Sequence, residues 1–463
     1  MPDWAAMATS DQLNSASATI DLLQHLIRAR CVNTGAADSG HEHRAVDLIG
    51  AVIENTGAEI ERYEPIPGRV SLVARLRGSD PEAPSLCLMG HTDVVPVDEA
   101  GWDHDPFGAE LITDADGRTE VWGRGAVDML NLTSAMTIAF ATAAHRRDRL
   151  RGDLVLFAVA DEEAGSVHGA QWMADHHRDA IATDYVLTES GGLHTGPSDA
   201  PRISVAVAEK GVAWRRLRIR GVPGHGSRPY RSDNALVTAA AVIDRLARYR
   251  PTPRLHEMWQ HELDGLGLDD ETRARLMDPG GIDEFLAGLE SDGLAAHLHA
   301  CTHTTMSPNA VHDAVSMKTN IIPGLVEIDV DIRTLPGETD DDVAQHLRSA
   351  LGDALYGRVE VETLINHPAS MSRTDTALWD AIATAVSHPF PDATLRPHFM
   401  VGFTDARVMR QLGAVAYGAG LFSPEMDPAE FGQRFHGHNE RIDIESLALT
   451  TEFYERVITG LVM

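Results

Sequence analysis

The chain has 463 residues, 43% of them hydrophobic, so it is long enough for two or three globular domains with a large core. Its 69 acidic and 39 basic side chains give a formal net charge of -30. Because phosphate groups are bound mainly by Lys and Arg, this balance argues against nucleic acid or an anionic membrane as a partner. We interpret the acidity as serving solubility or salt tolerance.

Cysteine usage and the N-terminal sequence indicate a cytoplasmic protein. Cys31, Cys87 and Cys301 are widely spaced and odd in number, which does not favour a disulfide framework and is typical of a reducing compartment. The N-terminus lacks a basic stretch followed by an apolar run, so no signal peptide is expected. The longest uncharged helical stretch, 131–144, is too short and too polar to span a bilayer.

The first part of the chain alternates between helical and strand patterns. Amphipathic helices are predicted first, and buried strands appear as short apolar runs between glycines and prolines. The predicted helices are 20–30, 44–56, 130–145 and 169–177, and the predicted strands are 70–76, 85–89, 154–160 and 185–187. This alternation predicts an α/β domain with a mixed central sheet flanked by helices.

The pattern changes after about Glu209. Strands are predicted at 213–220, 316–320, 326–331 and 359–365, helices at 234–249 and 341–351, and a polar helical segment at 251–299. The β-α-β-β-α-β order indicates an inserted two-layer α+β domain. A helix at 375–386 and a strand at 415–418 then return to the first domain. We therefore predict a discontinuous catalytic domain, 1–211 plus 368–463, and an inserted lid, 212–367, that contains the extra segment 251–299.

The first candidate site residues end an apolar strand. His91 and Asp93 lie two positions apart, so in an extended chain they share a face at the carboxyl end of the strand, where α/β sheets place their sites. A neutral imidazole can bind a metal, and a carboxylate behind it would fix its tautomer. A polar strand end that turns into a loop is the alternative interpretation.

Further carboxylates follow at comparable positions. Asp128 opens an apolar helix, where it is either a ligand or an ordinary N-cap. Glu162 and Glu163 follow the strand at 154–159, and Glu189 follows the short strand at 185–187. Consecutive buried carboxylates repel each other, so they are either solvated or held together by a cation.

Histidines near the C-terminus complete the set. His436 and His438 stand two residues apart in Phe-His-Gly-His-Asn-Glu, and either could join the carboxylates. Mixed histidine and carboxylate ligation suits zinc, and two ions are needed to balance this much negative charge. HExxH, GxSxG and Walker A patterns are absent, so no other catalytic signature competes.

In the order of these motifs, from about His91 to Asn439, the chain resembles a family of dinuclear zinc hydrolases with a lid domain. Members of that family include aminoacylase, carboxypeptidase G, succinyl-diaminopimelate desuccinylase and acetylornithine deacetylase. The resemblance implies two Zn²⁺ per chain, with Co²⁺ or Mn²⁺ as possible substitutes. It implies five ligands: His91, Asp128, Glu163, Glu189 and His436. The Asp128 carboxylate would bridge both ions, and the peptide bond from Asp128 to Met129 would be cis. His438 is the alternative to His436.

The resemblance also implies roles for residues that bind no metal. Glu162 would be the general base, Asp93 would orient His91, and His225 of the lid motif would reach the scissile carbonyl. The substrate carboxylate would be held by residues of the lid and of a glycine-threonine loop: Asn320, Arg333, Gly402 and Thr404.

We therefore expect a hydrolase that cleaves an amide bond next to a carboxylate, as an N-acyl amino acid deacylase. A dipeptidase, a carboxypeptidase or a desuccinylase is the alternative, because the chemistry is the same and only the pocket differs. A non-catalytic binding protein on the same fold is a more distant alternative. Relatives of this kind dimerise through the lid, so a homodimer is expected in which His225 acts either in its own subunit or in the partner's.

Overall fold

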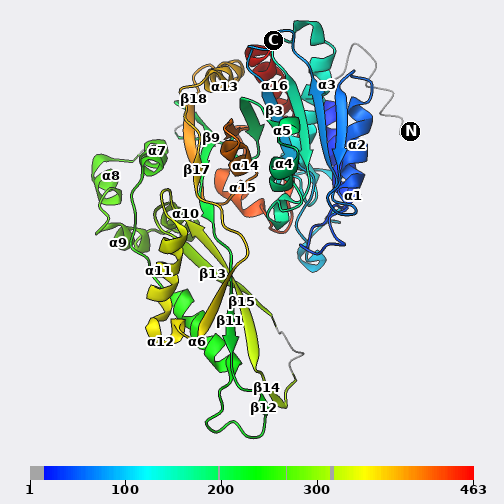
Figure 1. The fold of residues 1–463 in the computed structure, drawn as a ribbon. Coiled ribbons are helices and arrows are strands. Elements are labelled where there is room, and N and C mark those ends of the chain that lie inside the picture. The colour runs from blue at the N-terminus through cyan, green and yellow to red at the C-terminus, as the bar shows by residue number, and fades with distance from the viewer. Residues whose placement is uncertain (1–14, 197–198, 267, 313–317) are drawn as a thin grey trace.

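The computed structural model describes residues 15–196, 199–266, 268–312 and 318–463. Within these ranges the chain forms a large mixed sheet flanked by helices and, apart from it, a smaller antiparallel sheet (Figure 1). This confirms the predicted α/β architecture with a lid. Among the described residues, no helix is both long and apolar enough to cross a membrane.

The central sheet places four parallel strands side by side in its middle. β3 pairs in parallel with β6 and β7, and β7 pairs in parallel with β19. Every residue of β3 and β6 is buried, as the continuous apolar runs predicted. The strand order is β1 (Glu59–Tyr63), β2 (Ser71–Leu76), β6 (Leu154–Val159), β3 (Leu86–His91), β7 (Tyr185–Thr188), β19 (Val415–Gly418), β9 (Arg202–Glu209) and β17 (Ser370–Met371), with β18 (Thr394–Met400) and β8 (His194–Thr195) also on β9.

Helices cover both faces of this sheet. One apolar core lies under α1 (Ser15–Ala29), α2 (His43–Ile53), α3 (Leu130–Ala144), α13 (Ala377–Ser387), α15 (Pro428–Arg434) and α16 (Ile444–Leu461). A second, smaller core lies under α4 (Ala170–His176), α5 (Arg178–Ile181) and α14 (Ala406–Gln411). A small sheet of β4 (Glu110–Thr113), β5 (Thr119–Trp122) and β20 (Arg441–Asp443) brings the C-terminal region beside the segment that leads to Asp128.

The lid has the predicted β-α-β-β-α-β order. Its antiparallel sheet contains β13 (Thr305–His312), β15 (Leu325–Thr334), β11 (Arg215–Arg220), β16 (Val359–Thr363) and the short β10 (Gly211–Val212). Apolar side chains of this sheet pack against α6 (Ala235–Arg248) and α11 (Asp340–Leu351), and α12 (Asp353–Tyr356) follows α11. A two-stranded antiparallel sheet of β12 (Gly224–His225) and β14 (Ile321–Ile322) forms the end of the lid farthest from the central sheet (Figure 1).

One predicted lid strand is misplaced. Of the range 316–320, residues 316 and 317 lie outside the described part of the chain, and 318–320 form a turn. The strand at this place in the β-α-β-β-α-β order of the lid is β13, which lies before residues 316–320 in the chain. β13 contains a proline and alternates only weakly in burial, so its sequence gives a poor strand signal.

The extra segment is helical, as predicted, but its core contacts lie with the central sheet. It forms α7 (Glu257–Gly265), α8 (Asp270–Leu276), α9 (Ile282–Ala287) and α10 (Asp292–Thr302). α7 packs on β18, and Trp259 is fully buried in the main core. The buried Glu262 accepts hydrogen bonds from the Phe399 backbone N–H (2.6 Å) and from His398 Nδ1 (2.8 Å). Although the sequence grouped this segment with the lid, these contacts anchor it to the catalytic side.

Candidate metal centre

The candidate centre begins at the carboxyl end of β3. His91 is the last residue of this buried strand, and its Nδ1 lies 2.9 Å from the backbone oxygen of Asp93. Because a carbonyl oxygen can only accept, Nδ1 carries the proton and Nε2 is left as the atom that faces the other site residues. The geometry thus gives His91 the tautomer of a metal ligand.

Asp93 contacts more of the site than was predicted. Its carboxylate lies 3.7 Å from His91 Nδ1, so the nearer contact to that ring comes from its backbone oxygen. The same carboxylate accepts hydrogen bonds from the backbone N–H groups of Glu162 and Glu163, both at 3.2 Å. It also accepts one from Asn33 Nδ2 at 2.8 Å. Asp93 therefore fixes the backbone of the turn that carries the two glutamates.

Asp128 lies between the two histidines. Its Oδ1 is 3.2 Å from His91 Nε2, and its Oδ2 is 3.1 Å from His436 Nε2. The peptide bond from Asp128 to Met129 is cis, as the resemblance implied. One carboxylate oxygen therefore faces each imidazole, which is the arrangement that a bridging ligand requires.

Two groups of potential ligand atoms share this aspartate. In each group the ligand atoms lie within 4.8 Å of one another. The first joins His91, Asp128 and Glu189, with 3.8 Å between His91 Nε2 and Glu189 Oε2. The second joins Asp128, Glu163 and His436, with 3.2 Å between His436 Nε2 and Glu163 Oε2. The structure thus brings together the five residues proposed as ligands, in two sets that share Asp128.

Burial and mutual repulsion dominate the electrostatics of the carboxylates. Burial raises the pKa of Glu163 to about 7, and the neighbouring Asp128 carboxylate adds to the shift. Burial, followed by the charge of Glu189, raises the pKa of Glu162 well above its ordinary value. Burial would also raise the pKa of Asp128, but hydrogen bonds from His436 and His91 outweigh it and hold that pKa below its usual range.

The same carboxylates also raise the pKa values of the two imidazoles, because they stabilise the protonated rings. Hydrogen bonding to Asp128, and then to Glu163, raises the pKa of His436 to about 10. The cluster therefore has protons on its histidines and on some of its carboxyl groups when no cation is bound. Metal ligands must be deprotonated, so a cation would take the place of these protons.

The residues fit a pair of divalent cations. Each group supplies one imidazole nitrogen and carboxylate oxygens, the mixed donor set that suits zinc and similar ions. Glu163 Oε1 is buried without a hydrogen-bond partner, although its other oxygen faces His436. A buried carboxylate oxygen without a partner is costly unless something cationic is bound to it.

The choice between the two C-terminal histidines follows from their positions. His436 Nε2 points to Asp128 and Glu163, although half of its side chain is exposed. His438 lies against Gly101 and belongs to neither of the two ligand groups found among the described residues. The geometry therefore favours His436 as the ligand.

Two predicted lid residues lie away from this centre in the same chain. His225 belongs to β12 at the far end of the lid and bonds Ser227 Oγ through Nδ1 (2.7 Å) (Figure 1). Asn320 lies beside it and accepts the Gly226 backbone N–H through its own backbone oxygen (2.7 Å). Both residues are exposed in or next to the two-stranded sheet at the end of the lid. The structure thus brings these two residues together with each other but not with the metal ligands.

Arg333 lies where the lid meets the catalytic domain. Its guanidinium pairs with Asp331 through Nε (2.7 Å), while Nη1 is buried without a partner. It stacks on the ring of Phe403, 4.6 Å from the centroid, and Arg407 lies 4.5 Å from the same centroid. Trp214 meets Phe403 edge-on. A guanidinium with a free N–H next to aromatic rings is suited to hold an anionic group.

In the glycine-threonine loop, both donors of Thr404 are used by a neighbour within the chain. Thr404 is buried, and both its backbone N–H and its hydroxyl donate to Glu209 Oε2, at 2.7 and 3.0 Å. Gly402 precedes Phe403, and a side chain at this glycine would press on Met400. The loop therefore positions Phe403 under Arg333.

Two site residues were not given roles by the sequence analysis. Glu440 is fully buried, and its Oε1 accepts the backbone N–H groups of Val127 (2.8 Å) and Asp128 (3.1 Å). Its Oε2 accepts a hydrogen bond from Arg124 (2.7 Å). Glu440 ends the same motif that contains His436, so position within the motif was the available signal. Arg124 stands between two glycines, and this position alone does not indicate its buried partner.

Comparison with known proteins decides the family. The model of peptidase family M20/M25/M40 matches residues 87–460. The chain belongs to this family. Human aminoacylase-1 is 26% identical over 96% of this chain and 95% of its own length. A probable carboxypeptidase S-like 2 of Dictyostelium discoideum is 24% identical over 95% of this chain and 85% of its own length.

Two solved structures share the fold of this chain. An M20 family metallo-carboxypeptidase, Sso-CP2 of Sulfolobus solfataricus, has a TM-score of 0.70 at 18% identity and covers 97% of this chain and 99% of that chain. Human carnosine dipeptidase 1 has a TM-score of 0.69 at 16% identity and covers 99% and 97%. The recognition of a two-domain metallohydrolase from the motifs is thereby confirmed.

The role of Glu440 can be tested through metal affinity. In Glu440→Gln the amide NH₂ group must face either the backbone N–H donors or the Arg124 guanidinium, so the anchor of the loop before Asp128 should be weakened. We expect metal affinity to fall by about 10–100-fold, measured by competition with a chelating dye. Glu54→Gln, at an exposed position after α2, is the control. Unchanged affinity in Glu440→Gln would show that the loop holds Asp128 without it.

Proposed function

We propose that this M20 family member is an N-acyl amino acid deacylase that uses two Zn²⁺ and cleaves an amide bond next to a carboxylate. The observation that carries the proposal is Asp128, shared by two ligand groups beside a buried glutamate that joins neither group. Arg333, with its unpaired N–H, supports the carboxylate part of the proposal. Similarity to human aminoacylase-1 over nearly the whole of both chains supports the deacylase over the exopeptidase.

An exopeptidase or dipeptidase is the second candidate. The Dictyostelium discoideum relative is described as a probable carboxypeptidase and the human structural neighbour as a dipeptidase. The reaction at the metal centre would be the same. The two candidates differ in the group that carries the amide carbonyl, which is an acyl group for a deacylase and an amino acid or peptide for an exopeptidase. A binding protein without activity would have no use for Glu162 in addition to a full ligand set.

The ligands proposed for the two zinc ions are the five residues of the two groups. When bound, such ions supply Lewis acidity that lowers the pKa of water toward neutrality and polarises a carbonyl. The chain's own contribution is to hold one imidazole and one glutamate carboxylate on each side, with the Asp128 carboxylate shared between them. Co²⁺ or Mn²⁺ could use the same ligands.

Glu162 has the position of a general base. Its carboxyl group is buried near Glu189 and His91 but is outside both ligand groups, and its backbone N–H is held by Asp93. The adjacent Glu163 faces His436, so the two neighbours serve different purposes. Glu162 would take the proton from the attacking water and return it to the leaving amine.

Replacement of the base should separate catalysis from metal binding. In Glu162→Gln we expect turnover of an N-acetyl amino acid to fall by about a hundred- to ten-thousandfold, because the amide cannot accept the proton. Metal content should stay equal to that of the unmodified protein, since Glu162 is outside the ligand groups. Turnover would be followed by release of the free amine. Wild-type turnover in this variant would exclude Glu162 as the base, and loss of metal would make it a ligand.

Arg333 is proposed to position the substrate carboxylate. Two of its donors already engage Asp331, and the buried Nη1 faces no acceptor. Stacking on Phe403 fixes the plane of the guanidinium. A substrate carboxylate that accepts from Nη1 would satisfy this atom and orient the amide bond.

The carboxylate contact can be tested with a substrate panel of N-acyl amino acids, dipeptides and their carboxamides. We expect Arg333→Ala to lower kcat/KM for the carboxylate substrates by about 10–100-fold, since a hydrogen bond to a charged group is worth roughly 1.5–3 kcal/mol. The carboxamides should be affected little. Arg216→Ala, which removes an arginine paired with Asp329 on the same sheet, is the control. An equal loss on both substrate classes would indicate a structural role.

The position of His225 supports action across a homodimer. β12 lies at the end of the lid far from the central sheet (Figure 1), so its histidine does not reach the ligands of its own chain in this structure. Val222 and Tyr230, in the loops before and after β12, have large exposed side chains. We propose that the lid pairs with a second copy and that His225 enters the partner's site.

Mixed dimers can distinguish the two arrangements. Glu162→Gln and His225→Ala, each inactive alone, would be unfolded and refolded together in equal amounts. If His225 acts across the dimer, about half of the dimers carry both lesions in one site and none in the other, so about a quarter of wild-type activity returns. The two variants refolded separately and then mixed are the control. No recovery after joint refolding would show that His225 acts within its own chain.

A further inference from the structure

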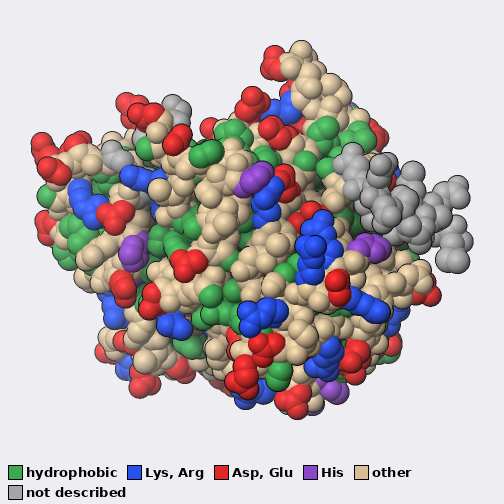
Figure 2. All heavy atoms as spheres, turned by 90° about the horizontal axis from the view of Figure 1, so that it is seen from above, with side chains coloured by type: hydrophobic (Ala, Val, Ile, Leu, Met, Phe, Trp, Pro, Cys, Tyr) green, Lys and Arg blue, Asp and Glu red, His purple; other side chains and the backbone are tan. Residues whose placement is uncertain are grey.

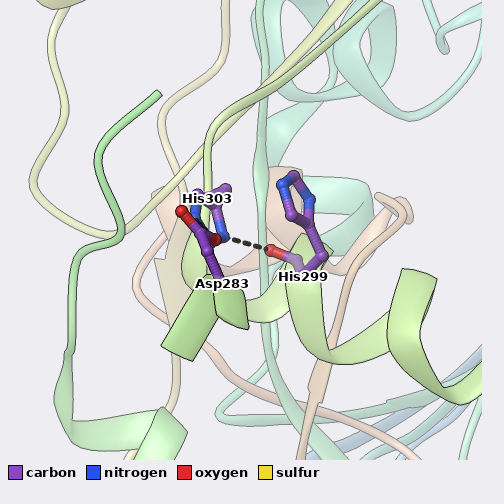
Figure 3. A group of neighbouring side chains, drawn as sticks. All are labelled: Asp283, His299 and His303. Atoms are coloured by element: carbon purple, nitrogen blue, oxygen red, sulfur yellow. Dashed lines mark hydrogen bonds and ion pairs between the residues drawn. The ribbon is translucent and has the colours of Figure 1, made fainter. Parts of the chain in front are cut away.

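A third group of potential ligand atoms lies in the inserted helices, away from the catalytic centre. It consists of Asp283, His299 and His303, whose ligand atoms lie within 4.8 Å of one another. Figure 3 shows the three side chains on neighbouring helical segments. Asp283 belongs to the first turn of α9, His299 to the last turn of α10, and His303 caps the C-terminus of α10. The i and i+4 spacing places both imidazoles on one helix face.

The ring of His303 is held in the orientation of a ligand. It is 1% exposed, and its Nδ1 lies 3.0 Å from the His299 backbone oxygen, the contact drawn as a dashed line in Figure 3. A carbonyl only accepts, so Nδ1 carries the proton and Nε2 has a free lone pair when the ring is neutral. An imidazole whose second nitrogen donates to a backbone carbonyl is common among metal-binding histidines.

The free nitrogen of His303 meets a carboxylate without forming a hydrogen bond to it. Nε2 lies 3.1 Å from Asp283 Oδ1, yet this buried nitrogen has no hydrogen-bond partner in suitable geometry. Two ligand atoms on one tetrahedral zinc ion, each about 2.0–2.1 Å from the metal, lie roughly 3.3–3.4 Å apart. The spacing of these two atoms is therefore close to that of two ligands of one ion.

His299 completes the group from the same helix. Its ring stacks on that of His303 with centroids 4.0 Å apart and planes 2° from parallel, so the His299 ring must rotate about its side-chain bonds to share one ion with His303. Burial, and then the neighbouring His303, lower the pKa of His299 to about 4, and burial also lowers the pKa of His303. Both rings are thus neutral near pH 7, which is the state that binds a metal.

Two basic residues oppose a cation here. Lys210 donates to the backbone oxygens of Ala300 and His303, at 2.9 and 2.6 Å. The positive charge of Arg250 also contributes to the lowered pKa of His299. The Lys210 ammonium faces the carbonyl ends of α10 rather than the imidazole nitrogens, and burial lowers its pKa to about 7. Its repulsion therefore weakens as the pH rises above neutrality, while Asp283 supplies the compensating negative charge.

We propose that Asp283, His299 and His303 bind a third divalent ion, of the Zn²⁺ type, separate from the catalytic pair. Two imidazoles and one carboxylate suit zinc, and water would complete four-coordination on the exposed side of Asp283. The ion would join α9 to the C-terminal turn of α10. That turn also receives Lys210, the residue that follows β9 as the chain passes into the lid.

Metal counting tests this site directly. Protein without a histidine tag would be dialysed against excess Zn²⁺, and the zinc per chain measured by mass spectrometry. We expect Asp283→Ala and His299→Ala each to bind one ion fewer than the wild type. His261→Ala, which removes a histidine of α7 outside the group, should bind as many ions as the wild type. Equal zinc in all four proteins would overturn the proposal.

Hydrogen exchange of α9 provides a readout that is independent of catalysis. At free Zn²⁺ ten times the dissociation constant, linkage predicts about tenfold slower exchange through openings that break the site. We expect this protection in the wild type and in His261→Ala, and its absence in Asp283→Ala. The wild-type measurement, with and without Zn²⁺, tests the proposal even if a variant fails to fold. Exchange in α9 that does not respond to zinc would overturn the proposal, whatever the catalytic centre binds.

Discussion

The concentration of buried negative charge at the carboxyl ends of β3, β6 and β7 is the constraint on which the rest of the site depends. Glu162, Glu163 and Glu189 lie there together with Asp128 and two imidazoles. An uncompensated buried charge costs several kcal/mol, so such a cluster persists only if cations or protons balance it. Since Asp128 faces both histidines, the compensating positive charge is divided between two sites that share this one carboxylate.

Buried arginines hold the surroundings of this cluster in place, although the chain as a whole is strongly acidic. Arg69 is fully buried and donates to Glu42 and to Asn33, and Asn33 in turn donates to Asp93. Arg124 supports Glu440, which holds the backbone at Asp128. The remaining charges are spread over the surface, and Figure 2 shows acidic and basic side chains interspersed on one face. The basic residues thus matter most as buried partners.

Most of the fold could be predicted because its signals are local. β3 and β6 are continuous apolar runs, and the lid strand β11 alternates in burial, so their sequences specify strands directly. β13 could not be predicted because half of its residues are polar and one is proline. The inserted helices were predicted as helices, but their attachment depends on Trp259 and Glu262 meeting β18, which lies more than a hundred residues away.

The candidate site likewise contains residues that sequence signals predict and residues whose roles depend on the folded chain. Four of the candidate ligands could be predicted because each lies at or just after the end of a strand or just before a helix, and His436 because the order of the motifs matched a known family. The roles of Asp93 and Glu440 were less accessible, because they act through backbone N–H groups whose positions depend on the folded turn. The placement of Thr404 against Glu209 likewise depends on contacts between distant segments.

The attachment of the inserted helices changes how the lid can move. In a lid with two chain connections, closure is a rotation about those two strands. Here the chain leaves the lid after α6, anchors α7 on β18, and returns through α10 to β13. The lid is therefore tied to the catalytic side by two additional chain connections. Lys210, which binds the end of α10, lies at the connection where the chain first enters the lid. Any closure over the metal centre must bend all of these connections together, which favours a small rotation that keeps Arg333 near Phe403.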